Sequence, residues 1–243
     1  SEETIKNAQG DNMLRQGRLV ENDGSSKQTL MGFPYFRRMG WQTRNKPTVL
    51  SDGRLLLPLY SDGFGFSLMA ITDDLGKSWS FSDPLVGPGN IQPAILERSN
   101  GELVAYMRDN GPPPKRLHMS VSKDRGESWS SVRDSELLNP GSAADGVRLA
   151  NGHWVLVFNN TERGRNRLSV ALSQDEGRSW EHTRDVEFDE RNLQIASTFH
   201  YPAIIQGSDG VLHLVYSYFR RDGSGGESKT IKYARLNEAW IVE

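Results

Sequence analysis

Short stretches rich in Arg, Asp, His and Tyr stand beside apolar runs throughout this sequence of 243 residues. A planar guanidinium such as that of Arg108 can grip a carboxylate through two parallel hydrogen bonds. Asp, His and Tyr side chains can accept or donate protons, and Asp145, His200 and Tyr201 supply one of each. Together these residue types suit the binding, and the chemical conversion, of a polar and anionic ligand.

A repeat of about 50 residues determines where these side chains must lie. Three octets share the pattern Ser/Thr-x-Asp-x-Gly-x-Ser-Trp, and their Trp residues, Trp79, Trp129 and Trp180, are 50 and 51 positions apart. In phase with them, Asp-Gly or Asn-Gly turns at 52–53, 100–101, 151–152 and 209–210 join pairs of apolar runs. Such turns are strong hairpin signals. Each repeat therefore contains four antiparallel strands, which is typical of a β-propeller blade.

The predicted fold is all-β, a β-propeller of four-stranded antiparallel blades. The blades cover about 44–89, 90–140, 141–197 and 198–243, and residues 1–43 precede them as an N-terminal segment or part of a blade. We expect the Asp residues of the octets to accept hydrogen bonds from their own turns. The three Trp residues are expected to pack between blades.

Composition excludes several classes of function. The net charge is −2, from 29 basic and 31 acidic residues, which argues against a nucleic-acid partner. Cys is absent, so disulfides, thiolate metal sites and Cys nucleophiles are excluded. No apolar stretch reaches the roughly 18 residues of a membrane span. No metal or cofactor is expected, while the oligomeric state and the localisation (periplasmic, secreted or cytoplasmic) stay open.

The ends of the first two strands of each blade meet at one end of a propeller, the mouth. Polar side chains gather at these positions. We expect catalytic groups among Tyr201, Asp145, His200 and Asp109, and groups that bind a glycan or oligosaccharide among Arg108, Arg44, Lys46, Gln92, Asn159 and Tyr218.

The octets resemble the Asp-box, or BNR repeat, of the sialidase superfamily, and in particular the bacterial BNR-repeat proteins called predicted neuraminidases. The resemblance covers residues 44–240. It implies a metal-independent enzyme that cleaves a terminal, carboxylated sugar from a glycan. Such enzymes use a Tyr nucleophile paired with a Glu, an Asp acid or base, and three Arg that hold the carboxylate.

The resemblance places Tyr201 at the nucleophile position and Arg108 among the three Arg. Gln92 stands where the Glu is expected, and a Gln side chain cannot take a proton. Asn45 stands where the opening-blade Arg is expected, with Arg44 before it. We therefore predict a sialidase-like glycoside hydrolase with an incomplete catalytic set, which is not an efficient classical sialidase.

Two alternatives fit the same residues. A lyase that abstracts the proton beside a uronate would use His200, Tyr201 and Arg108. A propeller without catalytic activity would bind a glycan or a protein through the same loops. Convergence of Arg108, Asp145, His200 and Tyr201 on one pocket would favour an enzyme.

Overall fold

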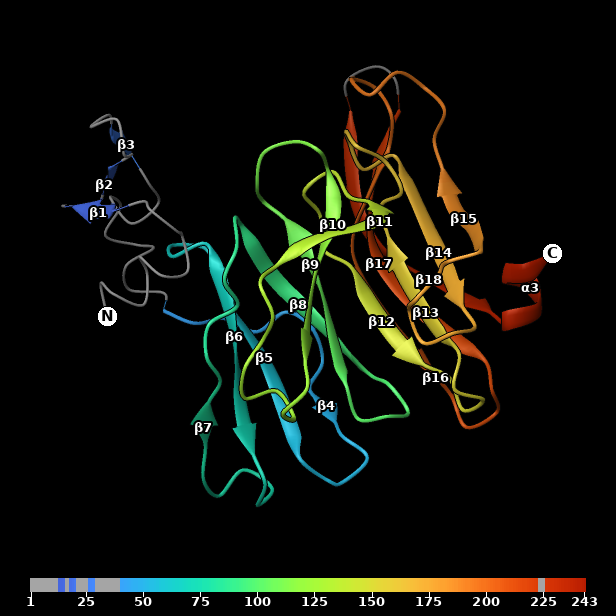
Figure 1. Cartoon of the computed structure of the whole chain (residues 1–243). Coiled ribbons are helices and arrows are strands. Elements are labelled where there is room, and N and C mark those ends of the chain that lie inside the picture. The colour runs from blue at the N-terminus through green and yellow to red at the C-terminus, as the bar shows by residue number, and fades with distance from the viewer. Residues whose placement is uncertain (1–12, 16–17, 21–25, 29–39, 223–225) are drawn as a thin grey trace. The chain divides into compact units, whose positions relative to one another are not determined.

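The computed structural model describes residues 13–15, 18–20, 26–28, 40–222 and 226–243 (Figure 1). Almost all regular structure in this part of the chain is antiparallel β-sheet, and the single described helix is α3 (Glu238–Val242). The chain divides into two compact units. Unit 1 comprises residues 1–97, 101–112 and 118–134, and unit 2 comprises residues 98–100, 113–117 and 135–243.

Four successive sheets correspond to the four blades, which confirms the predicted all-β propeller. Blade 1 pairs β4 (Thr48–Val49), β5 (Leu55–Ser61), β6 (Phe66–Thr72) and β7 (Ser80–Phe81) in chain order. Blade 2 pairs β8 (Asn90–Glu97), β9 (Leu103–Asp109), β10 (Arg116–Ser122) and β11 (Arg133–Leu138). Blade 3 pairs β12 (Asp145–Arg148), β13 (Trp154–Phe158), β14 (Arg167–Ser173) and β15 (His182–Phe188). The exact limits of the blades along the chain stay a prediction.

Blade 4 corrects the expectation of four strands in every blade. It pairs only β16 (Thr198–Gln206), β17 (Leu212–Arg221) and β18 (Glu227–Leu236) among the described residues. After β18 the chain forms α3, because the side chain of Asn237 accepts a hydrogen bond from Trp240 N at 2.9 Å and caps the helix. Strand β18 carries no Asp-box octet and ends directly in this helix.

A separate small sheet precedes blade 1. It joins β1 (Met13–Arg15), β2 (Arg18–Val20) and β3 (Ser26–Gln28) in that order. The remainder of residues 1–39 lies outside the described residues, so the suggestion of a partial blade in this segment stays a prediction.

Tight turns join the first two strands of each blade. In blade 3, Gly152 N donates to Leu149 O at 2.9 Å, and Gly152 has a φ of +91°. Gly53 makes the same turn in blade 1 with a φ of +92°. Glycine adopts this left-handed conformation without a steric penalty, so the Asp-Gly and Asn-Gly sequences fix the hairpins.

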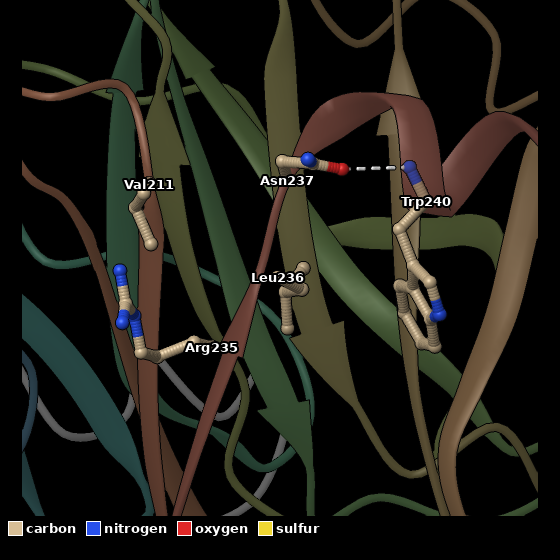
Figure 2. Close-up of a pocket in the computed structure, with 5 residues that line it drawn as sticks. All are labelled: Val211, Arg235, Leu236, Asn237 and Trp240. Carbon is tan, nitrogen blue, oxygen red and sulfur yellow. Dashed lines mark hydrogen bonds between the residues drawn. The ribbon is translucent and has the colours of Figure 1, made fainter.

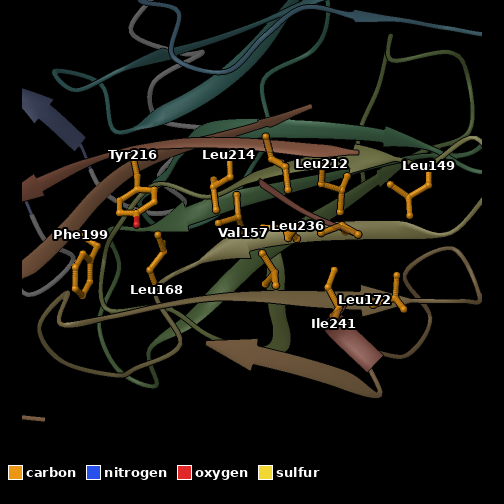
Figure 3. Packing of buried hydrophobic residues seen from close by; sticks show 13 residues of the cluster. Leu149, Val157, Leu168, Leu172, Phe199, Leu212, Leu214, Tyr216, Leu236 and Ile241 are labelled. Carbon is orange, nitrogen blue, oxygen red and sulfur yellow. The ribbon is translucent and has the colours of Figure 1, made fainter. Parts of the chain in front are cut away.

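Alternating apolar residues on the strands bury a hydrophobic core in each unit. In unit 2, the faces of blades 3 and 4 pack against each other around Val157, Leu168, Phe199, Leu214 and Tyr216, which are at most 3% exposed (Figure 3). In unit 1, residues of blades 1 and 2 form a second cluster, which includes Leu56, Met69, Leu103 and Met107. These cores hold the strands whose ends carry the polar residues.

The Asp-box octets have the structural role that the sequence predicts. Asp74 accepts hydrogen bonds from Ser78 N and Ser78 Oγ at 2.9 and 2.6 Å, and these bonds lower its pKa to about 2. Asp124 and Asp175 accept the same pair of bonds from Ser128 and Ser179. The three carboxylates therefore stabilise their own turns.

The expected role of the octet Trp residues holds only in part. Trp129 packs against the buried cluster of unit 1. The expectation is wrong for Trp79, which is 45% exposed and donates its Nε1–H to Gly76 O at 3.1 Å within its own turn.

Candidate functional site

The sequence-predicted residues are divided between the two units. Unit 1 holds Arg44, Lys46, Gln92, Arg108 and Asp109, and unit 2 holds Asp145, Asn159, His200, Tyr201 and Tyr218. Each group is described within its own unit. The expectation that residues of both groups share one pocket stays a prediction.

The first strands of blades 2 and 4 contain the same backbone irregularity at their mouth ends. The pairing register shifts between Ile91 and Ala94 in β8, and between His200 and Ala203 in β16. At these bulges Gln92 has a φ of +59° and Tyr201 a φ of +50°, although neither is a glycine.

Both residues are followed by Pro and Ala, so the two bulges correspond in sequence as well as in geometry. Left-handed conformations are unfavourable for side chains of this size, and strained residues outside tight turns cluster at functional sites. The bulges therefore mark Gln92 and Tyr201 as equivalent and candidate functional positions.

In unit 1, Gln92 and Arg108 lie on neighbouring strands. Arg108 lies opposite Ile91 in the β8–β9 pairing, one residue from Gln92. Gln92 is 4% exposed, and in the described structure its Oε1 has no hydrogen-bond partner. The buried Nε of Arg108 also lacks a partner there. An acceptor on β8 and a cationic donor on the paired strand β9 thus have unused hydrogen-bonding capacity among the described residues, which suits a polar anionic ligand.

Three residues before β4, at positions 44–46, differ in their contacts. Asn45 is buried and donates from Nδ2 to Gln92 O at 3.1 Å, which ties blade 1 to the bulge of blade 2. Arg44 donates to Asn45 Oδ1, and Lys46 is exposed. The structure therefore makes Asn45 a support of the bulge.

Asp109 points into blade 2. It is 0% exposed and its Oδ1 accepts a hydrogen bond from Gly111 N at 2.7 Å. His118 Nε2 lies 3.4 Å from the same oxygen and 3.4 Å from Asp134 Oδ1. These contacts support a structural role for Asp109.

Asp145 also serves the packing of its unit. It is 3% exposed, and its Oδ2 accepts a hydrogen bond from Ile204 N at 2.9 Å. Ile204 lies in the first strand of blade 4, so the Asp145 carboxylate joins blades 3 and 4. This contact supports a structural role for Asp145, and the catalytic role expected from the sequence stays a prediction.

Asn159 and Tyr218 are likewise engaged within unit 2. Asn159 is 0% exposed and donates from Nδ2 to Arg167 O at 2.9 Å and to Phe199 O at 3.2 Å. The Tyr218 ring stacks on Phe199 with centroids 5.5 Å apart, and Lys232 Nζ lies 5.0 Å from the Tyr218 centroid. Both side chains therefore contribute to the packing within unit 2.

His200 and Tyr201 lie beside an Arg that the sequence analysis did not single out. Arg165 Nη1 is 2.8 Å from His200 Nδ1, and Arg165 Nη2 donates to Gly141 O at 3.0 Å. The Arg165 Cζ lies 5.9 Å from the centroid of the Tyr201 ring, which is 46% exposed. This cluster of Arg165, His200 and Tyr201 is the place in unit 2 where predicted site residues come together.

A sequence signal for Arg165 exists. It belongs to the loop between β13 and β14, the mouth loop of blade 3, but it follows the polar residues 159–163 that stand directly after the strand. The backbone brings it back, because Phe199 N donates to Arg165 O at 2.8 Å. A search that covered the whole loop would have found this residue.

His200 is uncharged near neutral pH. Burial, and then the charge of Arg165, lower its pKa from 6.5 to about 4. Its Nε2 lies 2.7 Å from Thr198 Oγ1, and its ring stacks on Phe219 with centroids 4.3 Å apart. Both ring nitrogens therefore have partners inside the protein.

One hollow of unit 2 lies apart from this cluster. A hollow of about 350 Å³ is lined by Val211, Arg235, Leu236, Asn237 and Trp240, at the end of blade 4 opposite to Tyr201 (Figure 2). Across the described ranges, no group of three or more His, Cys, Asp or Glu side chains could hold a metal ion. No described helix is long and apolar enough to cross a membrane.

Comparison with known families agrees with the blades and their octets. The model of the BNR repeat-like domain family matches residues 38–214, which is most of the chain. The chain belongs to this family. The bulged strands and the Arg165 cluster are therefore features of a BNR repeat-like protein.

Known proteins similar to this BNR repeat-like chain include sialidases. A sialidase of Bacteroides fragilis is 26% identical over 159 residues, which cover 59% of this chain and 28% of that protein. The intramolecular trans-sialidase of Ruminococcus gnavus, solved with oseltamivir carboxylate, superposes with a TM-score of 0.64 at 18% identity and covers 93% of this chain and 50% of its own. The NanB sialidase of Streptococcus pneumoniae gives a TM-score of 0.67 at 19% identity, over 92% of this chain and 36% of its own.

This chain spans half or less of the length of these three proteins. At such identities the structural matches show the fold, a β-propeller like that of these sialidases.

Proposed function

We propose that this chain is a sialidase-like, carbohydrate-active propeller that acts on a terminal carboxylated sugar of a glycan, and that it binds this sugar far better than it hydrolyses it. The observation that carries the proposal is the Arg165–His200–Tyr201 cluster at the strained start of β16. Arg108, whose Nε has no hydrogen-bond partner among the described residues, supplies a second cationic group in unit 1. The sialidase names of the similar proteins support a sugar ligand.

The two Arg residues account for the preference for an acid. A guanidinium binds a carboxylate by charge-assisted and often bidentate hydrogen bonds. Tyr201 is exposed beside Arg165, so its phenol can reach a ligand held there. In this proposal Arg108 and Arg165 each bind a carboxylate or another acidic group, and Tyr201 faces the sugar.

The same side chains explain why turnover should be poor. In the mechanism that the resemblance implies, a Glu takes the proton of the Tyr nucleophile, whereas this chain has Gln92 at that position. Asp109 and Asp145 are nearly fully buried and bonded to backbone N–H groups, so neither stands ready as a general acid. These features favour binding over hydrolysis.

A lyase receives less support from unit 2. A lyase base must have a free lone pair for the proton beside the uronate carboxylate. His200 has a partner at each ring nitrogen and a pKa of about 4. The binding propeller without catalytic activity is therefore the stronger alternative.

The test combines binding with turnover. We expect titration calorimetry to detect the methyl α-glycoside of N-acetylneuraminic acid, while a fluorogenic sialoside is turned over below about 1 per second. Arg235→Ala, at the opposite end of blade 4, serves as the control for Arg165→Ala. Hydrolysis at ordinary enzymatic rates would contradict the proposed role of Gln92, and an absence of binding to every acidic sugar would remove the proposal.

A further inference from the structure

His200 has contacts on every side. Its ring stacks on Phe219 of β17, its Nε2 faces Thr198 Oγ1, and its Nδ1 faces Arg165 Nη1. Such a ring cannot turn without losing three contacts. Its two nitrogens must therefore have fixed hydrogen-bonding roles.

The partners determine those roles. A guanidinium has only donors, so the atom that receives Arg165 Nη1–H must carry a lone pair. Nδ1 of His200 is therefore unprotonated, and the single ring proton of the neutral imidazole is on Nε2, which donates it to Thr198 Oγ1 at 2.7 Å. The pairs define one tautomer of an uncharged ring.

The charged groups around the ring favour the same state. Arg165, Arg221 and Lys229 disfavour a positive charge on His200, and Glu227 opposes them. Lys229 also lies over Phe219, the ring on which His200 stacks, with its Nζ 4.7 Å from the centroid. A second positive charge next to Arg165 would break the hydrogen bond that the ring now accepts.

The same bond fixes the orientation of Arg165. The Nη1 atom is held by His200 Nδ1, and the Nη2 atom is held by Gly141 O at 3.0 Å. Two bonds to different nitrogens fix the plane of a guanidinium. The residue after His200 is Tyr201, whose bulged backbone places its ring beside Arg165.

We propose that His200 is a positioning residue: as a neutral Nε2–H tautomer it orients Arg165 beside Tyr201, and through Arg165 it sets the preference of the site for a carboxylated over a neutral sugar. This inference rests on the proposed function only for the nature of the ligand. The role of His200 as an acceptor for Arg165 stands without it.

Imidazole ¹⁵N NMR of the full chain tests the acceptor role without any ligand. We expect the His200 signals of the neutral Nε2–H tautomer from pH 5 to pH 8. His200→Asn, whose Oδ1 takes the place of Nδ1, should keep the Arg165 side-chain N–H signals protected from exchange, and His200→Leu should lose that protection. An imidazolium above pH 6, or an Nδ1–H tautomer, would overturn the inference.

Calorimetry then tests the preference of the site. The probes are the methyl α-glycoside of N-acetylneuraminic acid and its neutral methyl ester. We expect His200→Leu to lower the ratio of the two affinities about tenfold, because Arg165 loses its orientation, and His200→Asn to restore most of it. His213→Leu, at the other end of blade 4, is the control.

An unchanged ratio in His200→Leu would overturn the positioning role. If wild type binds neither sugar, the proposed function fails and the proposed preference fails with it. The NMR result would still decide whether His200 holds Arg165.

Discussion

Blades 2 and 4 build the same bulge and use it differently. In blade 2 the bulge holds Gln92, 4% exposed, beside an Arg108 whose Nε has no partner in the described structure. In blade 4 it holds Tyr201, 46% exposed, beside an Arg165 that is bonded to His200 and Gly141. The same type of bulge thus carries a buried amide side chain in one unit and an exposed phenol in the other.

The difference shows that the bulge fixes where a residue lies on the blade. The neighbouring strand or loop supplies the Arg that determines what this residue can bind. Arg108 comes from the strand paired with the bulge, and Arg165 comes from the loop of the preceding blade. The Nε of the first has no partner among the described residues, so its removal should act mainly on binding. The second is part of a bonded cluster, so its removal should affect binding and folding together.

The largest expected effect comes from the two arginines. We expect Arg108→Ala and Arg165→Ala each to weaken the binding of a carboxylated sugar by about 1.5–3 kcal/mol, as for a lost hydrogen bond to a charged group. Only Arg165→Ala should also lower the free energy of unfolding, by about 1 kcal/mol or more, because it leaves Gly141 O and His200 Nδ1 without their donor. Calorimetry and urea unfolding measure the two quantities.

The exposed Arg133, on the outer strand of blade 2, gives a matched control for Arg108. Equal losses of stability in Arg108→Ala and Arg165→Ala would contradict the contrast between blades 2 and 4. Combining Arg108→Ala with Tyr201→Phe in a double-mutant cycle would show whether the two residues act on the same ligand.

A smaller effect should appear when the strained residues are replaced. Because Tyr201 has a φ of +50°, Tyr201→Gly should be more stable to urea than Tyr201→Ala by roughly 1 kcal/mol. At Gln92, with a φ of +59°, the same comparison should give the same sign. The buried Gln92 side chain is lost in both variants, so the Gly-minus-Ala difference isolates the backbone. Equal stability of the Gly and Ala variants would remove the argument from strain.

A pH dependence should arise from His200 in blade 4. His200 has a folded-state pKa of about 4 against an ordinary value of 6.5, so the unfolded chain takes up its proton first as the pH falls. The free energy of unfolding should therefore decrease from pH 6.5 to pH 4. His200→Asn should lack this component, and the difference between wild type and variant in urea unfolding isolates it from other histidines.

The Asp-box turns lose stability in a different window. The pKa of Asp74 is about 2 against an ordinary 3.8, so its stabilising contribution is lost only below pH 3.8. A difference curve for His200→Asn that is flat between pH 6.5 and pH 4 would contradict the burial and charge argument for His200.

The sequence predicts the propeller because its signals are local and repeated. An Asp that bonds to Ser four residues later, as Asp175 does with Ser179, needs no tertiary contact to be foreseen. The same holds for the turns at Gly53 and Gly152. Three octets and four turns, all in phase, specify the blades.

The candidate site could be foreseen only in part, because its side chains depend on long-range packing. The direction of Asp145 follows from the backbone of Ile204, which is 59 residues away. The orientation of the Arg165 side chain depends on its hydrogen bonds to Gly141 and His200, which are 24 and 35 residues away. Residue type identified His200 and Tyr201, whereas only the fold shows which groups they contact.

The hairpin turns have a consequence for the chemical ageing of the protein. In an Asn-Gly turn the backbone nitrogen of the glycine is unhindered. It can attack the side-chain carbonyl carbon of the Asn, which releases ammonia. Asn151 resists this attack, because its Oδ1 accepts from His153 N and its Nδ2 donates to Glu238 Oε2 at 2.7 Å. Glu238→Ala should therefore speed deamidation at Asn151, which peptide mapping of stored protein would reveal as a new acidic species.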